Sequence, residues 1–167
     1  MLHTILEKIN QNKPFSQAKA HCDVPCGIYD PAVAQISALT VIRMTDLINE
    51  LAEKRDRTIA DEARLVRLSN EKEEHAIKVK NEVRIIWGDY FKEPQFEKVP
   101  NTHELVHAIM MKASACKQNV DRNMAVELLE LVNKFAEGFW LTKGVETFRA
   151  VCPYPPAEKV VYPKLDS

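Results

Sequence analysis

Residues 31–53 read PAVAQISALTVIRMTDLINELAE, with apolar side chains recurring every three or four positions. This spacing is typical of one face of an α-helix. The stripe consists of Val33, Ile36, Thr40, Met44, Leu47 and Leu51. Pro31 suits the first helical position, where its missing N–H costs nothing, and Asp30 suits the cap before it. The stretch predicts an amphipathic helix that must bury one face against other elements.

Three more helices with the same periodicity are predicted downstream, over about residues 58–91, 102–117 and 121–148. Their stripes are Leu65, Leu68, His75, Val79, Val83, Ile86 and Tyr90; Leu105, Ile109, Ala113 and Cys116; and Leu128, Val132, Phe135 and Phe139. Four helices with short links and no strand pattern predict an all-α fold, an antiparallel, up-down four-helix bundle.

Turn and cap signals separate these helices. Pro94 and Pro100 bracket a predicted loop. Asn101 or Thr102 is the expected cap of the helix that follows, and Asp121 the cap of the last one. The C-terminal stretch 149–167 holds four of the nine prolines, so it is expected to be an extended tail, either loose or laid on a neighbouring surface.

The composition is that of an ordinary globular chain of 167 residues, with 46% hydrophobic and 28% charged residues. The net charge of −1, with both signs interleaved, disfavours nucleic acid as a partner. No stretch approaches the ~20 apolar residues that cross a bilayer, so no membrane partner is expected. Four scattered cysteines are too few for a disulfide framework, which favours a cytoplasmic location.

Residues 21–31, HCDVPCGIYDP, precede the first helix and are called the hook below. Thiolates and an imidazole from His21, Cys22 and Cys26 suit a late transition metal and disfavour calcium and magnesium. If cleavage after Ala20 exposes the His21 amine, that amine, the Cys22 amide nitrogen and the two thiolates form a square plane, with the imidazole as axial ligand. This donor set indicates nickel or copper(II). The alternative is a pair of incidental thiols or a local disulfide.

The hook resembles the pattern His-Cys-Asp-x-Pro-Cys-Gly-x-Tyr-Asp-Pro of the nickel-containing superoxide dismutase family at every specified position. Residues 87–98, WGDYFKEPQFEK, are similar to that family's W-x-D-Y-F-K-x-P-x-F-E-K segment, and the resemblance extends from about His21 to Lys143. It implies an oxidoreductase that converts superoxide to O2 and hydrogen peroxide. One nickel ion per subunit would cycle between Ni(II) and Ni(III).

The resemblance also implies roles for residues around the metal. Asp23, Tyr29 and Tyr90 would limit access to it and order water for proton delivery. Without the resemblance, they would be a helix-entry cap and two tyrosines at the edge of the core. The Val24–Pro25 bond is expected to be cis. The family further implies a homohexamer in which neighbouring subunits cover each hook.

Residues 1–20 have two interpretations. Ala18-Lys19-Ala20 mimics the cleavage site of a secretory signal, but the apolar core of such a signal is missing. Leu2, Ile5, Leu6 and Ile9 fall at helical spacing, which predicts a short amphipathic helix. The resemblance favours a propeptide removed by a dedicated maturation protease. The expected organisation is therefore a propeptide at 1–20, the hook and bundle at 21–148 and the tail at 149–167.

The chain departs from the family at two positions. Where the family typically has a glutamate and an arginine that steady the axial imidazole, this chain has Ser37 and His75. Both changes together suggest a rewired support for the His21 imidazole. The alternative for His75 is an ordinary core histidine on the buried stripe of its helix.

Two other functions fit parts of the sequence. The first is a non-catalytic helical protein whose hook only stores nickel. The second is a zinc protease, because His103-Glu104-Leu105-Val106-His107 forms an H-E-x-x-H motif on a predicted helix. Against the protease, no strand pattern accompanies the motif, and Glu127 is the best available third ligand.

Overall fold

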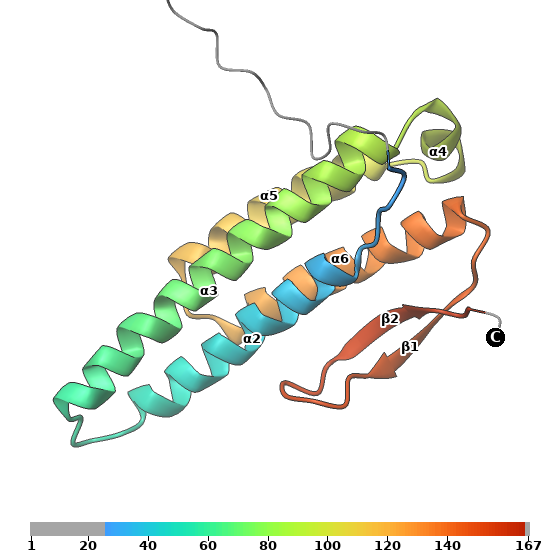
Figure 1. The fold of residues 1–167 in the computed structure, drawn as a ribbon. Helices are drawn as coiled ribbons and strands as arrows, with labels where there is room; N and C mark the ends of the chain where they lie inside the picture. Colours follow the sequence, from blue (N-terminus) through green and yellow to red (C-terminus); the bar gives the residue numbers. More distant parts are fainter. Residues whose placement is uncertain (1–25, 166–167) are drawn as a thin grey trace, which may run out of the picture.

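The structure is a computed structural model that describes residues 26–165, and there the chain forms four long helices along a common axis (Figure 1). They are α2 (Ala32–Ala52), α3 (Ile59–Ile85), α5 (Thr102–Gln118) and α6 (Arg122–Thr142). Contacts join α2 to α3, α3 to α5, α5 to α6 and α6 back to α2. Consecutive long helices run antiparallel (Figure 1). The predicted up-down four-helix bundle is confirmed.

Side-chain caps fix where several of these helices begin. The Asp30 carboxylate accepts the Ala32 N–H at 2.8 Å, although the residue directly before α2 is Pro31, one position later than predicted. Thr58 and Asp61 form a reciprocal capping box at the start of α3. Asp121 accepts the Met124 N–H at 3.1 Å at the start of α6. Asn101 occupies the cap position of α5, as one of the two predicted candidates, but its side chain makes no cap hydrogen bond and its φ is 66°.

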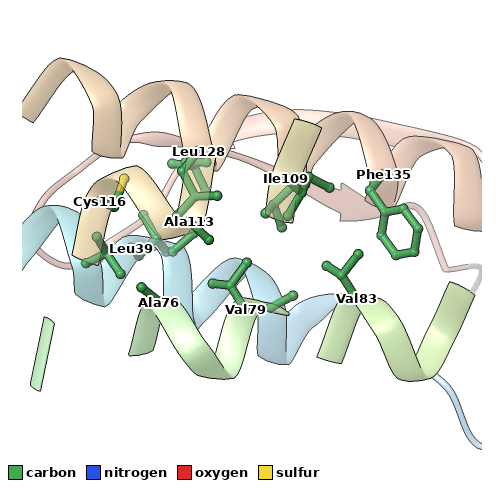
Figure 2. Packing of buried hydrophobic residues seen from close by; sticks show 14 of the residues in the cluster. Leu39, Ala76, Val79, Val83, Ile109, Ala113, Cys116, Leu128 and Phe135 are labelled. Atoms are coloured by element: carbon green, nitrogen blue, oxygen red, sulfur yellow. The ribbon is translucent and has the colours of Figure 1, made fainter. Parts of the chain in front are cut away.

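The core lies between the four long helices (Figure 2). Its buried members include most of the stripes predicted for α3, α5 and α6. Figure 2 labels Leu39 from α2, Ala76, Val79 and Val83 from α3, Ile109, Ala113 and Cys116 from α5, and Leu128 and Phe135 from α6. These side chains meet along the bundle axis, so the helical periodicity identified three of the four core faces.

The face predicted for α2 is wrong over most of the helix, although Leu51 at its end is buried. Val33 and Ile36 are exposed, whereas Ala34, Ala38 and Val41 are completely buried. Both sets recur at helical spacing, because α2 is apolar around much of its circumference. The neighbouring elements determine which set is covered, and the spacing within α2 carries no information about them.

The connection between α3 and α5 lies at one end of the bundle. α3 continues into a π-helical turn, η1 (Ile86–Tyr90), and a short helix follows, α4 (Glu93–Lys98). A loop was predicted here, but Pro94 lies in the first turn of α4, where a proline is tolerated. This end of the bundle carries the second family-like segment, residues 87–98.

Two strands follow the bundle where the sequence predicted the end of a helix and an extended tail. α6 ends at Thr142, six residues before the expected end at 148. Gly144 follows with a φ of +73°, a conformation that few residues other than glycine adopt. Strands β1 (Thr147–Val151) and β2 (Lys159–Pro163) then pair antiparallel. This hairpin lies alongside α6 and α2 in Figure 1.

Buried polar contacts attach the hairpin to the bundle. Asn133 of α6 donates to the Lys159 carbonyl at 2.9 Å and accepts the Val161 N–H at 3.2 Å. Gln35 of α2 donates to the Val161 carbonyl at 2.9 Å. The prediction that the chain contains no strand was wrong. Within residues 26–165, no helix has the length and apolar character needed to cross a bilayer.

Candidate metal centre

The structure describes the second half of the hook. Cys26 is exposed, and Gly27 has a φ of +70° that turns the chain immediately after the thiol. His21, Cys22, Asp23 and the Val24–Pro25 bond, with the expectations attached to them, lie outside the described residues. An exposed thiol can reach a metal ion, and a sharp turn next to it allows the chain to fold back around that ion.

The fold brings together two of the predicted site residues. The rings of Tyr29, from the hook, and Tyr90, from η1, have centroids 5.7 Å apart. These residues belong to the two family-like segments and are about sixty positions apart in the chain. Tyr90 is further held by Phe91 and Phe139, with ring centroids at 5.4 and 4.9 Å. The hook therefore leaves the bundle beside a fixed aromatic cluster.

The end of α6 supplies residues that sequence reasoning missed. The Tyr90 hydroxyl lies 2.7 Å from Thr142 Oγ1, and Lys143 Nζ lies 4.5 Å from the centre of the Tyr90 ring. Lys98 Nζ also donates to the Thr142 carbonyl at 3.4 Å. Positive charge is favourable at this helix end, where carbonyl groups lack partners. The one signal in the sequence for these residues was that the family resemblance extends as far as Lys143.

Ser37 and His75 lie at nearly the same distance from the link between α2 and α3, so they are at a similar level on neighbouring helices. Ser37 is buried and donates to the Val33 carbonyl at 2.7 Å. His75 is half-buried, with Nδ1 bonded to the Glu71 carbonyl at 2.9 Å. Each bond stays within the residue's own helix. The stripe of α3 predicted a buried His75, but the side chain is only partly buried.

The first histidine of the H-E-x-x-H motif, His103, makes contacts with other side chains of the fold. His103 Nδ1 accepts the Trp87 Nε1–H at 3.1 Å, and its ring stacks on Phe96 with centroids 4.4 Å apart. Glu127, the possible third ligand, pairs with Lys112. Residues 26–165 contain no group of three or more histidine, cysteine, aspartate or glutamate side chains suited to a metal ion. The described residues therefore give no support to a zinc site.

The other two cysteines in the described range are buried in the protein. Burial raises the pKa of the Cys116 thiol to about 11, so it stays protonated at neutral pH. The Cys152 thiol donates to the Tyr154 carbonyl at 3.2 Å. Metal ions bind the thiolate, which water stabilises. Of the cysteines the structure describes, Cys26 is the exposed one.

Comparison with known proteins identifies the family. The family model of nickel-containing superoxide dismutase matches residues 16–143. The chain is 35% identical over 130 residues to a nickel superoxide dismutase of Streptomyces coelicolor, covering 78% of this chain and 93% of that protein. A nickel superoxide dismutase of Streptomyces seoulensis is 34% identical with the same coverage.

Solved structures agree. The native crystal structure of a nickel superoxide dismutase matches with a TM-score of 0.63 and 36% identity, over 74% of this chain and 99% of that one. A structure in the oxidised state matches with a TM-score of 0.63 and 34% identity over the same shares. The family model ends before β1, so the hairpin lies outside the matched region. From its sequence and its fold, the chain belongs to the nickel-containing superoxide dismutase family.

Proposed function

We propose that this chain is a superoxide dismutase that converts superoxide to O2 and hydrogen peroxide at one nickel ion per subunit. His21, Cys22 and Cys26 would hold the ion. The observation that carries the proposal is the contact between Tyr29 and Tyr90. It joins the two segments that match the family, and Tyr29 lies three positions after the exposed Cys26 in the chain.

The reaction combines two superoxide anions and two protons into O2 and one hydrogen peroxide. Bound nickel supplies the one-electron couple, which two thiolates and an anionic amide bring into a usable range. The chain's own residues supply the surroundings. The rings of Tyr29 and Tyr90 restrict access to the hook, and Asp23 and the tyrosine hydroxyls order water near it.

The remaining elements of the proposal rest on the family resemblance and on composition. Residues 1–20 are a propeptide, and a maturation protease removes it to expose the His21 amine. The mature chain assembles as a homohexamer in the cytoplasm. Ser37 and His75 replace the usual support of the axial imidazole, at matching levels of α2 and α3.

The test uses the chain beginning at His21, loaded with nickel, and measures superoxide decay after pulse radiolysis together with bound nickel. Wild type should bind about one nickel per chain and dismute superoxide. Cys26→Ser should lose both, because a hydroxyl is a poor replacement for a thiolate ligand. Cys152→Ser is the matched control and should retain both, since Cys152 is buried in the hairpin region.

Other outcomes would favour the other candidates. Stoichiometric nickel without turnover in wild type would indicate a storage protein. Equal dismutation by wild type and Cys26→Ser would remove the hook from the reaction. Zinc-dependent peptide hydrolysis that persists in Cys26→Ser would support the motif at His103.

A further inference from the structure

The hydroxyl of Tyr90 has a determined direction. It lies 2.7 Å from Thr142 Oγ1, and Thr142 Oγ1 donates to the Phe139 carbonyl at 2.6 Å. A threonine hydroxyl has one proton, and this one is committed to Phe139. Thr142 can therefore only accept from Tyr90, so the Tyr90 O–H donates to Thr142.

This hydrogen-bond chain cannot deliver protons. It runs from Tyr90 through Thr142 to a backbone carbonyl, which has no proton to exchange. A relay would need a group at the far end that can take up or release a proton. The Tyr90 proton is thus held toward α6, and the phenol oxygen keeps only lone pairs for other partners.

The ring of Tyr90 is fixed as well as its hydroxyl. Lys143 Nζ lies 4.5 Å from the ring centre, and the Phe139 ring packs at 4.9 Å. Thr142 is only 9% exposed, so water does not readily replace its contact with Tyr90. Residues of one turn of α6 therefore set the position, the tilt and the proton of this tyrosine.

We infer that Thr142 is a positioning residue, which holds Tyr90 as a hydrogen-bond acceptor toward the hook. Tyr90 then orients water or another donor there, and the protons consumed by superoxide come from that donor rather than from the Tyr90 phenol. The catalytic half of this inference rests on the proposed function. The hydrogen bond itself does not.

The test compares Thr142→Val, which removes the hydroxyl at nearly constant volume, with Thr142→Ser, which keeps it. Thr45→Val is the matched control: Thr45 is also buried and also donates to a backbone carbonyl, that of Val41 at 2.8 Å, but it lies far along α2. Subtracting the spectrum of Tyr90→Phe isolates Tyr90 from the other tyrosines.

The first readout is the Raman doublet of tyrosine in nickel-free protein, which reports whether a phenol donates or accepts. Thr142→Val should remove the donor signature of Tyr90, and Thr142→Ser and Thr45→Val should keep it. The second readout is kcat with its solvent deuterium isotope effect in nickel-loaded protein. Thr142→Val should lower kcat about tenfold, the scale of one lost hydrogen bond, and should change the isotope effect. Both other variants should stay close to wild type.

An unchanged Raman doublet in Thr142→Val would overturn the inference whatever the activity. So would a changed doublet with unaltered kcat and isotope effect, because the bond would then have no effect on the reaction. Equal losses in Thr142→Val and Thr45→Val would reduce Thr142 to a packing residue. An inactive wild type would refute the proposed function, and the catalytic role of Thr142 with it.

Discussion

At the scale of single residues, Gly138 sets how closely the end of α4 approaches α6. A Cβ built on Gly138 would lie 2.9 Å from Val99 Cγ1, a distance that carbon atoms do not tolerate. Val99 is branched at Cβ and has few alternative side-chain positions. Because Gly138 has no side chain, residues 93–99 can pack closely against α6. This is the helix that ends at Thr142 and contacts Tyr90.

Gly138→Ala tests this contact. In an open helix, the change would stabilise by about 1 kcal/mol, through helix propensity. Here overlap with Val99 should cost about 1–3 kcal/mol, so the variant should have a lower melting temperature than wild type. Adding Val99→Ala should restore the propensity gain relative to Val99→Ala alone. If Gly138→Ala raises the melting temperature by itself, Val99 moves aside and the close approach is unimportant.

At the scale of elements, the π-helical turn η1 explains how Tyr90 reaches both the hook and α6. The Phe91 N–H bonds to the Ile86 carbonyl at 3.2 Å, five residues back. This turn holds an extra residue, which rotates the following side chains relative to a continuous α-helix. Periodicity alone predicted an uninterrupted helix to about residue 91. The wider turn places Tyr90 against Phe139 and leaves Phe91 in the core.

The start of α3 makes a pH-dependent contribution to stability. A hydrogen bond from Lys54, at 2.6 Å, followed by those from the Thr58 backbone and side chain, holds the Asp61 pKa well below its usual 3.8. The folded protein thus binds fewer protons than the unfolded chain. The stabilisation is present above pH 3.8 and is lost as the pH falls through the lower, folded pKa.

Asp61→Asn should therefore unfold at lower urea concentration than wild type at about pH 5, and the difference should shrink toward about pH 2. The measurement is the urea midpoint, followed by circular dichroism across this range. Asp56→Asn, a change at an exposed carboxylate in the same link, is the control and should show little difference. A gap between Asp61→Asn and wild type that is constant with pH would refute the explanation.

At the scale of the whole molecule, the hairpin packs against α2 and α6. The hairpin itself lies beyond the part of the chain that matches the family. Val160, Val161 and Cys152 are buried, and Arg149 pairs with Glu130 and Glu137 of α6. The surface pairs contribute little, because solvent screens them. The buried bonds of Asn133 should matter more, since they satisfy backbone groups of β2 that have lost their water.

Asn133→Ala should release the hairpin before the bundle unfolds. It leaves the buried Val161 N–H and the partly buried Lys159 carbonyl without the Asn133 partner, at a cost of about 1–3 kcal/mol for the buried N–H. Limited trypsin digestion followed by mass spectrometry should show faster cleavage after Arg149 and Lys159, with helix content retained. Asn119→Ala, at the exposed end of α5, is the control. Cleavage at the wild-type rate in Asn133→Ala would show that other contacts hold the hairpin.

The sequence predicted best what neighbouring residues encode together. The thiols of Cys22 and Cys26 and the imidazole of His21 lie within six positions, so their spacing alone restricts the metal. The helices of the bundle could be located because an apolar stripe repeats within each one. The cap of α6 could be identified because Asp121 and its partner, the Met124 N–H, are three residues apart.

The tertiary structure alone decided which apolar face of α2 is buried, that β1 and β2 form a hairpin docked through Asn133, and that Thr142 holds the hydroxyl of Tyr90. Each depends on groups from separate elements, and Tyr90 and Thr142 are 52 positions apart in the chain. Local spacing is fixed by backbone geometry, which every residue shares. Contacts between elements are fixed by how whole surfaces pack, and no short stretch of sequence contains both surfaces.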